Sequence, residues 1–289
     1  MLIRPQYQRR VLSSVTKRNW PAPTGAARAL TWRYALGAYV CATGLIAVIV
    51  AAEKASKNTV FGGVANIVAE TLTLVLLVPA VRSRRLRPRD LGLRQTVAVS
   101  AAGYAVLALI GYAVAICIWV LVIPQTTNQA AHKLSGVNHH PGTLAAVLIV
   151  VGLAVFAPVC EEVFFRGMLY RSLRNRLPLW PAVLIAGSLF GLIHIFSHPL
   201  NSIPVLIAFG ILMCLLYERT GSVLPGIAVH SFVDGTIGVV AVTGKAYAAL
   251  GFYGLLLLSV LAMSIRAARR TQPPTAEKLP VGDIAIDAA

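Results

Sequence analysis

Long runs of hydrophobic residues separated by short polar stretches dominate this chain. A helix needs about 20 apolar residues to cross the hydrocarbon layer of a membrane. Eight runs meet or approach that length: residues 33–52, 60–81, 97–123, 143–162, 182–197, 202–217, 222–243 and 247–265. The fifth and sixth runs are the shortest. The pattern therefore predicts an all-α, polytopic membrane protein with about eight transmembrane helices, forming one helical domain over residues 33–270.

The composition supports a membrane protein. Hydrophobic residues make up 57% of the 289 residues, charged residues only 12%, and the mean hydropathy is +0.74. These values lie outside the range of soluble globular domains. The four cysteines all lie in apolar segments without paired spacing, which predicts neither a disulfide framework nor a thiolate metal site. No glycine-rich nucleotide-binding loop, P-loop or His-Glu-x-x-His motif is present.

The positive charges are concentrated in alternate loops. Of the 26 Lys and Arg residues, 22 lie in the N-terminal tail up to Arg33, the loop 82–94, the stretch 166–176, the turn at Arg219 and the C-terminal tail. The positive-inside rule then places both termini in the cytoplasm. We expect a basic cytoplasmic tail over residues 1–32 and a disordered one over 271–289. This bias explains the net charge of +16, so no nucleic-acid partner is expected.

The fourth run ends in two adjacent glutamates, Glu161 and Glu162, followed by Arg166. A carboxylate at membrane depth costs at least about 2.5–3.5 kcal/mol, so this group indicates a functional site. On an α-helix, positions i and i+4 share a face, which predicts an ion pair between Glu162 and Arg166. Glu161 points about 100° away from Glu162. It is therefore left without a local partner and is available as a base. A plain ion-pair network at the cytoplasmic interface is the alternative.

Two further runs carry ionisable residues, in Phe190-Gly-Leu-Ile-His194 and His230-Ser-Phe-Val-Asp234. A lone histidine in an apolar helix is more often a core residue than a catalyst. With a rise of about 1.5 Å per residue, however, Glu161 and His194 come to the same height within about one helical turn. His230 and Asp234 reach a similar depth from the start of their own span. We therefore expect these groups to converge in the cytoplasmic half of the membrane.

Such a cluster can activate water for attack on an amide. Glu161 or His194 would remove the proton, while His230 and Asp234 would polarise the carbonyl or stabilise the oxyanion. The other version places a metal ion, zinc in the usual case, among Glu161, His194 and His230, with an open position for water. Neither version needs a serine or cysteine nucleophile.

The three motifs resemble those of the CAAX protease and bacteriocin-processing (CPBP, or Abi) family of intramembrane peptidases. That family carries Glu-Glu-x-x-x-Arg, Phe-x-x-x-His and His-x-x-x-Asn or a similar residue, in this order and on separate spans. Here they correspond to residues 161–166, 190–194 and 230–234. The resemblance covers about residues 143–243, which would form the peptidase core.

The resemblance implies an eight-helix fold with a cavity open to the cytoplasm and endopeptidase activity on a membrane-associated peptide or protein. It implies that Glu161 and His194 activate water, that His230 and residue 234 bind the oxyanion, and that Glu162 and Arg166 shape the site. The sequence departs from the family at Asp234, where eukaryotic members have Asn. An ionised Asp only accepts hydrogen bonds, so it must be protonated, orient His230 or bind a metal. CAAX-type and bacteriocin-type substrates both stay open.

Two other classes of function use buried Glu, His and Asp. A proton-coupled transporter is one, but the two halves of the chain show no repeat of the kind common in transporters. A non-enzymatic immunity or scaffold protein on the peptidase fold is the other. Among the remaining residues, Glu70 lies midway along the second span, and Gly62, Gly63 and Gly187 fit close helix packing. The Ala-rich, Arg-rich composition indicates a bacterial cell membrane.

Overall fold

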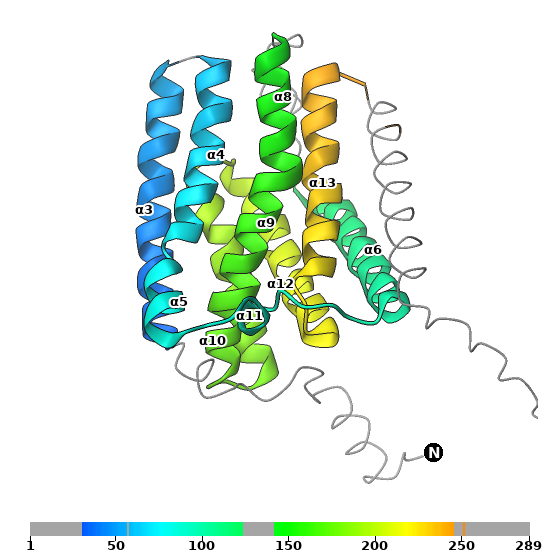
Figure 1. Cartoon of the computed structure of the whole chain (residues 1–289). Helices are drawn as coiled ribbons and strands as arrows, with labels where there is room; N and C mark the ends of the chain where they lie inside the picture. Colours follow the sequence, from blue (N-terminus) through cyan, green and yellow to red (C-terminus); the bar gives the residue numbers. More distant parts are fainter. Residues whose placement is uncertain (1–30, 57, 124–141, 246–250, 252–289) are drawn as a thin grey trace, which may run out of the picture.

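The computed structural model describes residues 31–56, 58–123, 142–245 and 251, and all of its regular elements over that part of the chain are helical (Figure 1). The elements are α3 (Trp32–Ser56), α4 (Thr59–Val75), α5 (Val78–Arg84), η1 (Pro88–Leu91), α6 (Ala98–Val122), α8 (Thr143–Val151), η2 (Gly152–Phe156), α9 (Ala157–Glu161), η3 (Glu162–Tyr170), α10 (Arg171–Arg174), α11 (Leu179–Leu192), η4 (Ile193–Phe196), η5 (Leu200–Ser202), α12 (Ile203–Thr220) and α13 (Leu224–Thr243).

Seven helical segments of the described residues are long and apolar enough to cross a membrane. They coincide with the first seven predicted spans, so the expected all-α, polytopic membrane fold is confirmed. The eighth expected span, 247–265, falls almost entirely outside the described residues, as do the two expected tails. The number of spans therefore stays at seven for the part of the chain that the structure covers.

The fourth span is longer than the hydrophobic run that predicted it. It extends from Thr143 to Arg174, 32 residues against the 20 expected, because the helix continues through the charged motif to the basic end of the bundle. Two stretches of this span, η2 and η3, are π-helical. Pro158 at the start of α9 lacks a backbone donor, which fits the widened turn of η2 before it. The second π-helical stretch begins at Glu162, and such turns are frequent at functional sites.

Helices α11 and α12 form a short hairpin whose turn lies below the upper ends of α3, α8 and α13 in Figure 1. Glycines let these two helices approach closely. A Cβ atom on Gly187 would lie 2.8 Å from the backbone nitrogen of Ile211, and one on Gly210 would lie 2.6 Å from the Gly187 carbonyl oxygen. The close packing expected at Gly187 is confirmed. It holds α11, and with it η4 at the end of the fifth span, against α12.

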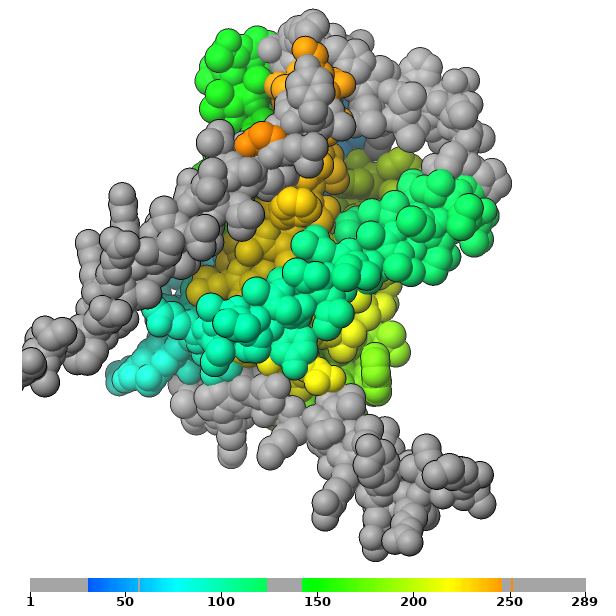
Figure 2. Space-filling model, turned by 90° about the vertical axis from the view of Figure 1, so that its right-hand side faces the viewer, coloured from blue at the N-terminus to red at the C-terminus, as the bar shows by residue number. Residues whose placement is uncertain are grey.

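The same close packing occurs at the predicted Gly62-Gly63 pair, where a Cβ on Gly63 would lie 2.8 Å from Leu148 Cβ. On another side of the bundle, α6 crosses obliquely over α12 and α13 (Figure 2). Tyr112 of α6 packs edge-on against Phe209 of α12, with ring centroids 4.8 Å apart. These contacts bring one residue of α6, Tyr112, to the wall of the central cavity.

Candidate active site

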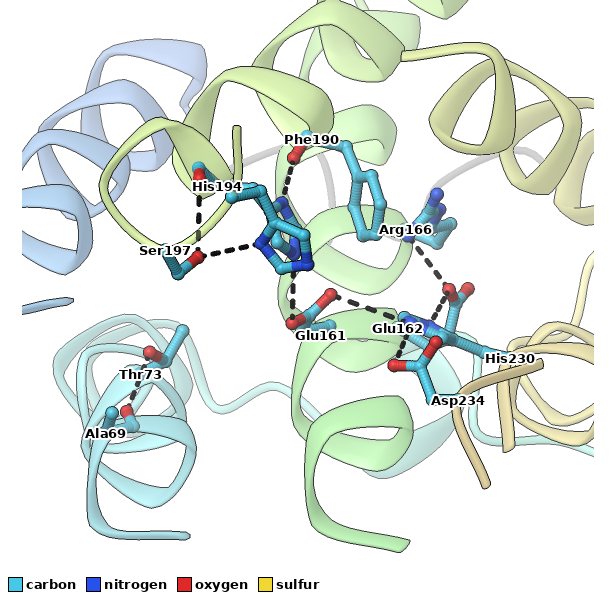
Figure 3. A network of polar contacts seen from close by, with 11 residues as sticks. Ala69, Thr73, Glu161, Glu162, Arg166, Phe190, His194, Ser197, His230 and Asp234 are labelled. Atoms are coloured by element: carbon cyan, nitrogen blue, oxygen red, sulfur yellow. Dashed lines mark hydrogen bonds and ion pairs between the residues drawn. The ribbon is translucent and has the colours of Figure 1, made fainter. Parts of the chain in front are cut away.

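The three predicted motifs meet at one cavity. Glu161 ends α9, Glu162 and Arg166 belong to η3, His194 lies in η4, and His230 and Asp234 lie on α13 (Figure 3). The cavity has a volume of about 220 Å³. Glu161, His194, His230 and Asp234 all line it, together with Phe190. The expected convergence of these side chains is therefore present.

Glu162 and Arg166 form the ion pair predicted from their spacing. Arg166 Nη1 lies 2.8 Å from Glu162 Oε1, and the two side chains are 0% and 1% exposed. Arg166 Nη2 donates to the carbonyl oxygen of Gly210, 3.1 Å away, and its guanidinium carbon lies 4.5 Å from the centre of the Phe190 ring. Removing one partner of such a pair costs about 3–5 kcal/mol because the other charge stays buried. The pair therefore fixes η3, α11 and α12 against one another beneath the cavity.

Glu162 also holds His230. The same Oε1 atom that accepts from Arg166 lies 3.2 Å from His230 Nδ1. Its other oxygen points at the backbone of Gly226, where a Cβ atom would lie only 2.6 Å from Oε2. Gly226 and His230 are four residues apart and share a face of α13. The absence of a side chain at 226 thus lets Glu162 reach the histidine.

Both ring nitrogens of His230 face carboxylates. Nε2 lies 3.2 Å from Asp234 Oδ2 and 3.8 Å from Glu161 Oε2, while Nδ1 faces Glu162. The ring packs between Phe209 and Phe190, with centroid distances of 4.9 and 5.8 Å. This ring is therefore fixed in plane and in rotation, and either of its nitrogens can donate to a carboxylate. The contact with Asp234 is compatible with an aspartate that orients His230, one of the three roles open at this position.

His194 is held by the backbone of its own helix end. Its Nδ1 lies 2.8 Å from the carbonyl oxygen of Phe190, which can only accept, so Nδ1 carries the hydrogen. In the neutral ring Nε2 then presents a lone pair. That Nε2 lies 3.8 Å from Glu161 Oε1, too far for a direct hydrogen bond but close enough for both to contact one small molecule.

Glu161 thus lies between the two histidines, with one oxygen toward each. A third element faces the same cavity, because Glu70 of α4 lines it together with Glu161. Glu70 is 8% exposed and lines the same cavity.

The sequence indicated Glu70 as a costly residue in the second span, but it did not place it at the cavity. A depth argument could have done so. Glu70 lies 11 residues from Thr59, at a rise of about 1.5 Å per residue, which is near the middle of the bundle where Glu161 also lies.

The zinc site expected from Glu161, His194 and His230 stays a prediction. No group of three or more His, Cys, Asp or Glu side chains is arranged to hold a metal ion within the described part of the chain. His230 is the reason in physical terms, since both of its nitrogens already face carboxylate oxygens at 3.2 Å. A metal ligand needs a free lone pair directed at the ion. His194 and Glu161 meet that condition, but two ligands alone do not make the predicted site.

One family model matches the chain. Residues 143–236 match the model described as Rce1-like, type II CAAX prenyl endopeptidase. No curated protein and no solved structure matches the chain. The matched segment runs from the start of α8 into α13 and contains all three motifs. The resemblance derived from those motifs is therefore confirmed: residues 143–236 of this integral membrane protein are similar to the type II CAAX prenyl endopeptidase family.

Proposed function

We propose that this protein is an intramembrane endopeptidase in which Glu161 and His194 activate a water molecule for attack on a peptide bond. The observation that carries the proposal is the position of Glu161 between two histidines on the wall of the cavity, 3.8 Å from each. A water molecule between Glu161 Oε1 and His194 Nε2 would contact two acceptors. Its oxygen would then face the cavity, where the substrate carbonyl is bound.

The hydrolysis can be written without a metal ion. Glu161 removes a proton from the water as its oxygen attacks the carbonyl carbon, and the carbonyl electrons move onto the oxygen. Collapse of this intermediate breaks the carbon–nitrogen bond. The proton held by Glu161 passes to the leaving amine, so the enzyme returns to its starting state.

His230 is the donor for the oxyanion. Its Nε2 lies between Asp234 and Glu161 and faces the cavity. Asp234 and Glu162 hold the ring and favour a hydrogen on each nitrogen, and a donor fixed in advance stabilises charge that develops in the transition state. Asp234 then acts through His230 and makes no direct bond to the oxyanion. With His230 as the oxyanion donor and Asp234 as its support, an aspartate can serve at position 234, where eukaryotic members of the family have an asparagine.

The experiment uses purified full-length protein in detergent and a membrane-tethered peptide that releases a fluorophore when cut. Glu161→Gln keeps the size of the side chain and removes the base, so cleavage should fall by about 100-fold or more. Ser83→Ala is the control, because Ser83 is exposed and does not line the cavity. It should cleave like the unchanged protein. Full cleavage by Glu161→Gln contradicts the proposal, and loss of cleavage after exhaustive chelation contradicts the metal-free chemistry.

A further inference from the structure

The cavity extends from Glu161 mainly toward one end of the bundle. Most of its lining residues lie on that side of the motifs: Ile46, Ile49, Val50 and Glu53 on α3, Asn66 and Ala69 on α4, Leu153 and Ala157 above Glu161, and Val233, Asp234 and Ile237 above His230. Thr73 on α4 and Phe165 on η3 extend it by only about one helical turn in the other direction. Glu53 and His198 are exposed at the rim, and Lys54 Nζ donates to the Phe196 carbonyl oxygen beside it. The mouth therefore lies at the end of the bundle where α3 and α13 finish and α4 begins.

The opposite end is sealed directly beneath the site. Arg166, Phe164, Met168 and Tyr170 are all 0% exposed. The segment after α5 is fastened across this end, where η1 packs so tightly on η3 that a Cβ on Gly167 would collide with the carbonyl oxygen of Leu91. Substrate cannot reach Glu161 through this packing.

The same segment is bonded to the turn between α12 and α13. Val223 donates its backbone N–H to the Gly92 carbonyl at 3.0 Å, and Ser222 Oγ donates to the Arg94 carbonyl at 2.6 Å. Arg94 Nε in turn donates to the Gly221 carbonyl, also at 2.6 Å. Three bonds between segments far apart in sequence close the floor of the bundle.

The positive charge lies at the sealed end. Among the described residues, that end carries Arg33, Arg82, Arg84, Arg85, Arg87, Arg89, Arg94, Arg171, Arg174, Arg176 and Arg219. At the open end the described Lys and Arg residues are Lys54 and Lys245. By the positive-inside rule the arginine-rich end faces the cytoplasm. The basic loops and the mouth of the cavity lie at opposite ends of the bundle. The sequence predicted that both face the cytoplasm, and only one of the two can.

We infer that the cavity opens on the extracytoplasmic side and that the enzyme takes its substrates from there. The charge distribution decides between the two expectations because it involves eleven arginines of this chain at one end. A cavity open to the cytoplasm would place all of them on the outer face. The inference about orientation stands on the charges and on the lining of the cavity, and it needs no assumption about catalysis.

The substrate class follows if the proposed peptidase activity holds. Glu70, beside Glu161, lies 11 residues along α4 from Thr59, which puts the site about 16 Å below the mouth. An extended chain advances about 3.3 Å per residue, so about five residues are needed to span that depth. The walls are largely apolar, and the described lining includes Glu53, Glu70, Glu161 and Asp234 but no Lys or Arg. The substrate is therefore an extended, apolar segment without carboxylates, at the extracytoplasmic end of a membrane-anchored or exported peptide.

Orientation is tested with two matched cysteines. Ser56→Cys at the open end and Ser83→Cys at the sealed end both replace an exposed serine. Each is introduced into a protein in which the exposed Cys41 and Cys117 are changed to Ala, and that protein without added cysteine is the blank. A membrane-impermeant maleimide should label Ser56→Cys on intact cells and Ser83→Cys only after permeabilisation. The reverse pattern overturns the inference.

Access to the cavity is tested with the same reagent. His198→Cys lies on the rim, so attachment of a bulky impermeant maleimide from outside should lower cleavage at least tenfold. The same modification of Ser83→Cys, made in permeabilised cells, should leave cleavage unchanged. If blocking the rim has no effect on cleavage, the mouth is not the entry route and the inference fails.

The substrate side is tested with two reporters that carry one apolar segment on either face of the membrane. The extracytoplasmic reporter should be cut at least tenfold faster. Cutting of the cytoplasmic reporter alone overturns the inference. If the labelling pattern holds and neither reporter is cut, the orientation is supported and the proposed peptidase activity is what fails.

Discussion

The contact between Gly226 and Glu162 gives a sharp test of how the site is supported. In Gly226→Ala the new Cβ would lie 2.6 Å from Glu162 Oε2, whereas ordinary contacts begin near 3.4 Å. Glu162 must therefore shift by about 0.8 Å. The carboxylate cannot move into solvent, because it is buried and held by Arg166. The bond that gives way is the one to His230 Nδ1, which is already 3.2 Å long.

The size of the effect follows from that bond. A hydrogen bond to a charged group contributes about 1.5–3 kcal/mol. If the transition state loses the whole free energy of this hydrogen bond to His230, kcat/KM falls by about 10- to 150-fold, at about 1.4 kcal/mol per factor of ten. KM should change little, because Gly226 does not line the cavity. Thermal unfolding should also begin at a lower temperature, since overpacking a buried contact costs about 1–3 kcal/mol.

The control lies on the same helix. In Gly238→Ala the nearest atom to the new Cβ is the end of the flexible Leu153 side chain, 3.3 Å away. That variant should match the unchanged protein within about threefold in kcat/KM on the tethered-peptide assay. Equal activity of the two alanine variants would refute the idea that Glu162 supports catalysis through His230. A loss of stability alone, with kcat/KM intact in Gly226→Ala, would refute it equally.

Two further predictions concern the residues around His230 and Glu161. Asp234→Asn keeps an oxygen that accepts from His230 Nε2, so its cleavage rate should stay within about tenfold of the unchanged protein. Asp234→Leu removes that acceptor and should cleave about 100-fold more slowly. An equal fall in cleavage rate in both variants would show that the negative charge itself is required. Glu70→Gln keeps a polar side chain in the cavity wall and should lower kcat/KM less than Glu70→Leu. Cleavage kinetics of the four variants, each checked for a normal unfolding temperature, test both predictions. If Glu70→Leu cleaves as fast as the unchanged protein, Glu70 has no part in the site.

The sequence was most informative where a rule of spacing applies. The spacing of Glu162 and Arg166 predicted their ion pair, and the rise per residue predicted that His194, His230 and Glu161 lie at one level. The length of each apolar run predicted seven of the described helices. Each of these expectations depends on one helix or on heights along helices, which local geometry determines.

The sequence was least informative about contacts that depend on how helices are rotated about their own axes. The sequence gave no distance between Asp234 and His230 Nε2, which is 3.2 Å in the structure. Rotation of α4 turns Glu70 toward the cavity that Glu161 also lines, and nothing in the hydropathy of that span specifies it. The same holds for Gly226, whose significance comes from a side chain on a different helix. Positions along a helix could be predicted, but the facing of one helix toward another could not.

The arrangement of charges also explains how so many ionisable groups are tolerated within the membrane. An isolated carboxylate at this depth would destabilise the helix that carries it. Here Glu162 accepts from Arg166 and His230, and Asp234 and Glu161 both face His230. Each carboxylate of the motifs is thus compensated by a cationic or hydrogen-donating group from the motifs themselves. Because Glu161 has the longest of these contacts, at 3.8 Å, it keeps the most capacity to accept a proton from water. In the proposed mechanism the base therefore lies where compensation is weakest, and tightening the contacts of Glu161 should stabilise the protein and slow peptide cleavage.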